Sequence, residues 1–279
     1  MLSYQHSYHA GNFADVHKHS VLLLLLRALQ AKEKPFFVLD AFAGRGLYQL
    51  GDAEAEKTGE YLQGIGRIWQ KPSLPDSMSD YMQAVRNVNS DLKLKQYPGS
   101  PLLIRSMIRE QDRMAVCELH PAEFDALRQI LYSEKRVALH KRDAVGGMKA
   151  MLPPKERRGL LLLDPAYEVK QEYESVPAAV VDAYRHWREG IYAIWYPLLT
   201  AGNHEKLRAS LKRSGIRKML DSQLMVDTPE SGGMYGSGMI IINPPWRLKD
   251  QLEELLPWLA ARLAGSGSAP SGVRWLVPE

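Results

Sequence analysis

The feature that most constrains this fold is a regular alternation of short, continuous apolar runs with amphipathic helical patterns. A strand that is apolar on both faces belongs in the middle of a sheet that helices cover on both sides. The sequence therefore predicts an α/β fold built on a mostly parallel sheet. The apolar runs are Phe36–Leu39, Met114–Cys117, Val137–Leu139, Leu160–Leu163, Ile191–Trp195 and Met239–Ile242. The helical patterns are Pro101–Glu110, Pro121–Leu131, Val176–Trp187 and His204–Lys212.

One interval, from Leu47 to Tyr97, interrupts this alternation. It contains no clear strand pattern, but Gly59–Gln70 and Asp76–Asn89 are typical of helices. Such an interval is too long for a simple connection between a strand and a helix. We therefore expect an inserted helical subdomain at residues 47–97, within a main domain formed by residues 1–46 and 98–279.

Composition excludes several classes of protein. A hydrophobic content of 45% over 279 residues can fill a core, and a net charge of +4 permits an anionic partner without requiring one. The single cysteine, Cys117, excludes an internal disulfide and a multi-cysteine zinc site. The apolar run Val21–Leu26 is too short to span a bilayer. We expect a soluble, cytoplasmic monomer in which Cys117 is a core residue.

The first apolar run leads into a glycine loop, Asp40-Ala-Phe-Ala-Gly-Arg-Gly46. Glycines at 44 and 46 allow a tight turn and a close approach of the backbone to a ligand. A plain turn is an alternative interpretation. A dinucleotide site is less favoured, because its third glycine is missing here.

Acidic residues follow the ends of several predicted strands, and these are Asp40, Glu118, Asp143 and Asp164. The carboxyl ends of parallel strands face the crevice in which such sheets bind ligands. A carboxylate there can accept hydrogen bonds from ribose hydroxyls or an adenine amino group. Each acid alone could equally be a solvated turn residue, but together they favour a common binding crevice.

Two motifs carry a specific resemblance. Asp40-x-Phe42-x-Gly44-x-Gly46, followed by Asp164-Pro-Ala-Tyr167, resembles the paired motifs of S-adenosylmethionine-dependent adenine-N6 methyltransferases. With MLSYQHSYHAGNFADVHKHS (1–20), YPGSP (97–101) and SGMIIINPPW (237–246), the chain resembles, nearly end to end, the bacterial 23S ribosomal RNA adenine-N6 methyltransferase J family (RlmJ). This resemblance implies a Rossmann-like class I methyltransferase fold with an antiparallel last strand and a helical insertion. It also implies S-adenosyl-L-methionine as cofactor and 23S ribosomal RNA as substrate.

The resemblance also implies individual site residues. Tyr4 would lie near the target base, and Asp164 would be at the reacting end of the cofactor. Two positions depart from the family: Phe42 stands where a histidine is expected, and Ala166 replaces the second proline of Asp-Pro-Pro-Tyr. Together with Asp40 and Gly44 of the glycine loop, the cofactor contacts expected are Lys18, His19, Phe42, Ser100, Glu118, Asp143, Ala144 and Asp164.

The motif Asp164-Pro-Ala-Tyr167 suits methylation of an exocyclic adenine amine, whose lone pair is delocalised into the ring. Ionised Asp164 can accept one amino hydrogen and the carbonyl of Pro165 the other, which would direct the lone pair toward the methyl group. The ring of Tyr167 offers a surface for base stacking, which contributes about 1–3 kcal/mol. We expect Asp164, Pro165 and Tyr167 to be catalytic.

Alternatives remain open. Asn243-Pro-Pro-Trp246 also fits an amino-methyltransferase motif, used by glutamine-N5 protein methyltransferases, but an antiparallel last strand would point Asn243 away from the crevice. We expect a turn with a packed Trp246 there. A DNA adenine-N6 or cytosine-N4 methyltransferase, or a non-catalytic RNA-binding protein, is also possible. The histidines His6, His9, His17 and His19 suggest a metal site, but no metal is expected, because His17 and His19 do not share a helix face and no cysteine lies nearby.

Basic residues form two clusters that could contact phosphates. The upstream basic cluster adjoins the Asp164 motif in sequence and is the better candidate for RNA binding. It comprises Lys135, Arg136, Lys141, Arg142, Lys149, Lys155, Arg157 and Arg158. The downstream basic cluster comprises Lys206, Arg208, Lys212, Arg213, Arg217 and Lys218. The glycine-rich loop Gly232–Gly238 could also meet substrate.

Overall fold

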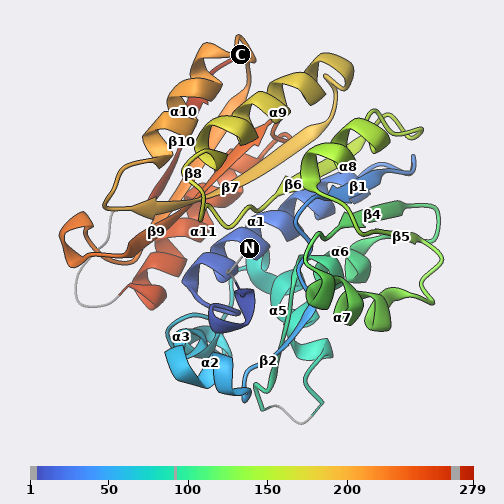
Figure 1. The fold of residues 1–279 in the computed structure, drawn as a ribbon. Coiled ribbons are helices and arrows are strands. Elements are labelled where there is room, and N and C mark those ends of the chain that lie inside the picture. The colour runs from blue at the N-terminus through green and yellow to red at the C-terminus, as the bar shows by residue number, and fades with distance from the viewer. Residues whose placement is uncertain (1–4, 91–92, 265–270) are drawn as a thin grey trace.

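An eight-stranded sheet forms the centre of the computed structural model, which describes residues 5–90, 93–264 and 271–279 (Figure 1). The order of the strands is β10-β8-β9-β7-β6-β1-β4-β5. Their bounds are β1 Phe37–Asp40, β4 Arg113–Cys117, β5 Val137–His140, β6 Gly159–Leu163, β7 Ile191–Leu199, β8 Met219–Met225, β9 Met234–Ile242 and β10 Gly272–Val277.

Strands β5, β4, β1, β6 and β7 run parallel, whereas β9 runs antiparallel to both of its neighbours. This arrangement confirms the predicted α/β class with its mostly parallel sheet and antiparallel β9. Strands β8 and β10 were not predicted from the sequence. β8 shows no strand pattern in the sequence because three consecutive polar residues, Asp221-Ser-Gln223, interrupt it. Their side chains are buried and hydrogen-bonded to residues that are distant in sequence.

Helices cover both faces of the sheet. On one face α1 contacts both α11 and α6, and on the other α9 contacts both α8 and α10, with α7 beside β5 (Figure 1). Their bounds are α1 Phe13–Gln30, α6 Ser100–Met107, α7 Pro121–Leu131, α8 Ala144–Met151, α9 Glu172–His186, α10 His204–Arg213 and α11 Leu248–Leu263. None of the helices within the described ranges is both long enough and apolar enough to cross a membrane.

Helix α1 is buried almost on every side, which is unusual for a helix that carries charged residues. Its first turn is capped by Asn12, whose side chain accepts hydrogen bonds from the N–H groups of Ala14 and Asp15. The side chain of His17, on α1, faces the sheet and is hydrogen-bonded to Ser237 of β9 and Ser222 of β8, at 2.9 Å each. Burial lowers the pKa of His17 to about 3, so it is a neutral core residue.

Residues 47–97 form short helices beneath the main sheet (Figure 1). Strands β2 and β3 pair antiparallel at the two ends of the segment. They were not predicted from the sequence, because three residues are too few to reveal an alternation. The segment packs on α1 through Tyr97, whose hydroxyl lies 2.7 Å from His19 Nδ1 and 3.0 Å from the Tyr81 hydroxyl. The elements are β2 Leu47–Gln49, α2 Ala53–Thr58, α3 Glu60–Gln63, α4 Ile65–Ile68, a 3-10 turn Asp76–Met78, α5 Ser79–Asn87 and β3 Gln96–Pro98.

Candidate active site

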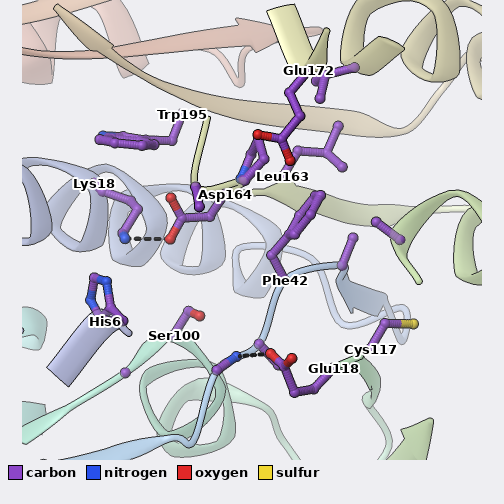
Figure 2. A pocket seen from close by; sticks show the side chains of 18 of the residues that line it. His6, Lys18, Phe42, Ser100, Cys117, Glu118, Leu163, Asp164, Glu172 and Trp195 are labelled. Atoms are coloured by element: carbon purple, nitrogen blue, oxygen red, sulfur yellow. Dashed lines mark hydrogen bonds and ion pairs between the residues drawn. The ribbon is translucent and has the colours of Figure 1, made fainter. Parts of the chain in front are cut away.

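A cavity of about 540 Å³ opens where the carboxyl ends of β1, β4, β5 and β6 meet. The strand order reverses between β1 and β6, since the chain winds toward β5 on one side and toward β10 on the other. Doubly wound sheets bind ligands at this kind of reversal. Helices α1 and α9, the glycine loop and the residues after β6 complete the cavity wall (Figure 2).

Asp164 follows β6 directly and is held by a buried lysine. Its carboxylate accepts a hydrogen bond from Lys18 Nζ, which is also 2.8 Å from Asp15 Oδ1 (Figure 2). The side chains of Lys18 and Asp15 are 4% and 1% exposed, whereas that of Asp164 is 15% exposed at the cavity wall. Burial alone would lower the pKa of Lys18, but the charges of Asp15 and Asp164 raise it above its ordinary value. Lys18 is therefore a permanent cation that holds Asp164 in place.

The glycine loop holds a second carboxylate. Gly44 N–H donates to Glu118 Oε2 at 2.8 Å, and the N–H of His120 donates to Glu118 Oε1 at 2.6 Å (Figure 2). Gly44 has φ +63°, and a Cβ there would lie 2.5 Å from the Tyr48 hydroxyl, so only glycine fits. Burial raises the pKa of Glu118 despite these hydrogen bonds. The loop thus presents a carboxylate at the end of β4.

Asp40 lies beneath the cavity and does not line it. Its side chain is fully buried and accepts a hydrogen bond from Ser100 Oγ at 2.7 Å. Burial raises the pKa of Asp40 to about 7. Ser100 itself lines the cavity. Asp40 is therefore linked to the cavity through Ser100 and does not face it directly.

The end of β5 contributes Asp143 and Ala144 to the cavity wall. Asp143 caps α8, because its Oδ1 accepts from the N–H of Gly146 at 2.8 Å. Cys117 is fully buried, and burial raises the pKa of its thiol to about 12, so it is an inert core residue, as predicted.

Most of the residues expected at the site line this one cavity. Those that do are Lys18, His19, Phe42, Gly44, Ser100, Glu118, Asp143, Ala144, Asp164 and Pro165. Tyr4 lies outside the described residues. The cavity also includes Glu172 and Trp195, which sequence reasoning did not single out, and His6, which it considered only as a metal ligand. The sequence could have indicated these three residues only through their positions, since each lies near a motif or near the end of a helix or strand.

Tyr167 occupies a different place from the one we expected. Its side chain is 6% exposed and its ring packs on Tyr173 and Trp195, at centroid distances of 4.4 and 6.0 Å. Its hydroxyl donates to the carbonyl of Trp195 at 2.8 Å. The ring therefore lies behind the cavity wall. It is stabilised there by aromatic packing on Tyr173 and Trp195 and by its hydrogen bond to the Trp195 carbonyl.

The sheet divides the upstream basic cluster between two edges. Lys141 and Arg142 follow the carboxyl end of β5, and Arg142 lines the cavity. By contrast, Lys135 and Arg136 precede β5, and Lys155, Arg157 and Arg158 precede β6, so these residues lie at the opposite edge. The prediction that the whole cluster lies near Asp164 was therefore wrong. Residues that precede a strand and residues that follow it lie at opposite edges of the sheet.

The second motif, Asn243–Trp246, lies at the edge of the sheet away from the cavity. Asn243 follows antiparallel β9, and its side chain donates to the carbonyls of Arg188 and Gly190 before β7. This agrees with the predicted strand-ending turn. Trp246, however, is 89% exposed and not packed as expected; the guanidinium carbon of Arg247 lies 5.7 Å from its ring centroid.

The histidines of the amino-terminal region have separate roles. His6 Nε2 lies 2.9 Å from Asp15, whereas His9 Nδ1 lies 2.9 Å from Glu60 in the inserted segment. Over residues 5–90, 93–264 and 271–279, no group of three or more histidine, cysteine or acidic side chains is arranged to hold a metal ion.

Comparison with known proteins gives consistent matches. A family model described as "Ribosomal RNA large subunit methyltransferase D, RlmJ" matches residues 33–277. The chain is 46% identical over 281 residues to ribosomal RNA large subunit methyltransferase J of Escherichia coli (strain K12), and 45% identical over 282 residues to that of Haemophilus influenzae, with 100% of both chains covered in each case. A crystal structure of a Legionella pneumophila protein is 35% identical with a TM-score of 0.90, covering 96% of this chain and 98% of the other.

Proposed function

Because this chain belongs to the family of ribosomal RNA large subunit methyltransferase J, we propose that it methylates the N6 amine of a specific adenine in 23S ribosomal RNA. The methyl donor is S-adenosylmethionine. The observation that carries this proposal is the position of Asp164: its carboxylate is held by Lys18 on the wall of a cavity at the reversal point of the sheet.

The residues of the cavity fit this donor. Glu118 is held by backbone N–H groups in a position to accept hydrogen bonds from ribose hydroxyls, and Asp143 with Ala144 flanks the region suited to an adenine ring. His19, Ser100 and Lys18 would contact the amino acid end of S-adenosylmethionine. When bound, S-adenosylmethionine supplies an electrophilic methyl group that needs little activation.

The task of the protein is then to position the acceptor amine. Asp164 accepts one amino hydrogen and the carbonyl of Pro165 the other, so the nitrogen lone pair points at the methyl carbon. Positioning of this kind supplies a large share of the acceleration in a group transfer. As the new bond forms the nitrogen becomes acidic, and Asp164 or water takes the released proton. Stacking of the target base on Tyr167 would require the ring to turn out of its pocket.

Replacing Ala166 with proline is expected to leave methyl transfer unchanged or raise it. Ala166 lines the cavity, and among the described residues no hydrogen-bond acceptor is assigned to its N–H, so proline would remove no bond. The proline ring would restrict φ and stiffen the loop. Steady-state rates of the Ala166→Pro variant and the wild type measure this effect. A large drop in rate would show that the loop needs the freedom that alanine gives.

Phosphate contacts are expected at the cavity edge of the upstream basic cluster. We expect Arg142→Ala to weaken RNA binding and to lower the slope of log K against log salt by about 1, because one phosphate contact is lost. Lys155→Ala, at the opposite edge, is the matched control and should leave that slope unchanged. Titrations at several salt concentrations test this. Equal effects of both substitutions would contradict the assigned RNA face.

The decisive experiment is methylation of total RNA from a bacterial strain lacking this gene, followed by mapping of the modified base. Methylated adenine in 23S RNA supports the proposal. Incorporation into DNA would favour a DNA methyltransferase instead, and cofactor binding without transfer would favour a non-catalytic RNA-binding protein. An rRNA substrate also implies a cytoplasmic location. We further propose that the chain acts as a monomer, which light scattering of the purified protein would test.

A further inference from the structure

Glu172 brings a carboxylate into the cavity that the proposed chemistry does not use. It is the first residue of α9, shortly after the Asp164 motif, and it lines the same cavity as Asp164 and Phe42. Figure 2 shows its side chain reaching from α9 toward the space between the Asp164 carboxylate and the Phe42 ring. The carboxylate therefore faces the part of the cavity where the reacting groups meet.

This carboxylate lacks a counter-charge. Glu172 Oε2 is buried and, within the described residues, has no hydrogen-bond partner and no ion pair. Two other acids on the cavity wall have a counter-charge: Asp164 pairs with Lys18, and Glu123 with Arg45, whose Nη2 is 2.6 Å away. Glu118 and Asp143 instead accept hydrogen bonds from backbone N–H groups. Burial raises the pKa of Glu172 and the negative charge of Glu168 adds to this, although backbone hydrogen bonding from Val169 and Tyr167 opposes it.

A carboxylate oxygen that is buried without a partner is unfavourable unless a bound ligand compensates it. The ligand class expected here, a sulfonium donor, carries a positive charge at its reacting atom, whereas its demethylated product is a neutral thioether. A sulfonium has no N–H or O–H to donate, so its attraction to a carboxylate is Coulombic. This attraction is lost when the charge is lost.

We propose that Glu172 is an electrostatic partner of the cationic donor and makes the cavity prefer S-adenosylmethionine over its demethylated product. The inference rests on the proposed function. In the reaction the carbon–sulfur bond breaks and a nitrogen–carbon bond forms. The positive charge leaves sulfur for the acceptor nitrogen, and the released proton goes to Asp164 or water. The neutral product lacks this attraction and is therefore held less tightly than the donor, which favours its release.

Calorimetry of the full chain tests this with Glu172→Gln, which removes the charge and keeps the shape. The ligands are S-adenosylmethionine, S-adenosylhomocysteine, and an analogue with a protonated amine at the sulfur position. We expect the affinity for both cations to fall about fivefold, as for unit charges about 4 Å apart in a water-like dielectric. Affinity for the neutral thioether should stay the same, which also shows that the variant is folded.

Glu174→Gln is the matched control, since it removes an equal charge from an exposed residue of the same helix that does not line the cavity. Its ratio of donor to product affinity should equal that of the wild type. An unchanged ratio in Glu172→Gln would overturn the inference, as would a changed KM for RNA with unchanged cofactor affinities, which would make Glu172 an RNA contact. Failure of the wild type to bind the donor would overturn the proposed function as well.

Discussion

Replacing Asp164 with alanine is expected to abolish methyl transfer to RNA, a loss of about 10²–10⁴-fold or more. The substitution removes the carboxylate that would accept an amino hydrogen and later the proton. It also leaves the buried Lys18 with Asp15 as its remaining acidic partner. Transfer of labelled methyl groups to RNA measures the effect, and calorimetry with S-adenosylmethionine separates loss of catalysis from loss of cofactor.

Asn243→Ala is the matched control, because Asn243 begins the other candidate motif but lies at the far edge of the sheet. Its activity should remain near that of the wild type once any loss of stability is taken into account. If Asn243→Ala were inactive while folded, and Asp164→Ala active, the reaction centre would have been assigned to the wrong motif.

Replacing Lys18 with methionine is expected to lower both stability and activity. Asp15 would lose its ion pair with Lys18 in a site where it is 1% exposed, and breaking a buried pair costs about 3–5 kcal/mol. Asp164 would lose its positioning contact, and misplacement of a catalytic group can cost about 10²-fold in rate. Urea unfolding and methyl transfer assays measure the two effects. Lys32→Met, at an exposed position after α1, should change stability by less than about 0.5 kcal/mol.

The stability difference between wild type and Lys18→Met should depend on pH. Burial would raise the pKa of Asp15, but the charges of His6 and Lys18 hold it well below its ordinary value. The stabilisation from Asp15 is therefore complete above its unfolded pKa of about 4 and is lost as pH falls through the lower folded pKa. The pKa of Lys18 is raised, so its contribution persists until pH exceeds about 10. The difference should be constant near neutral pH and shrink below about pH 4; a constant difference down to pH 2 would contradict the ion pair.

The sequence allowed the binding crevice to be predicted because it is a local property repeated along the chain. Glu118, Asp143 and Asp164 each follow an apolar run, and parallel strands bring their carboxyl ends to one edge. The same pattern predicted α7 with its observed bounds, Pro121–Leu131. Two predictions remain untested. One is that residues 47–97 form a separate subdomain, and the other is the role of each site residue toward a bound ligand.

Sequence alone thus determined that helices alternate with the strands β1, β4, β5, β6, β7 and β9, and at which edge of the sheet the carboxylates gather, since both follow from periodicity along the chain. Tertiary structure alone decided which side chains meet: Lys18 with Asp164, 146 residues apart, and the ring of Tyr167 in its pocket beside Trp195. It also separated Arg142 from Lys155, although they are close in sequence. The physical reason is that ion pairing and burial depend on packing between distant segments, which no local pattern records.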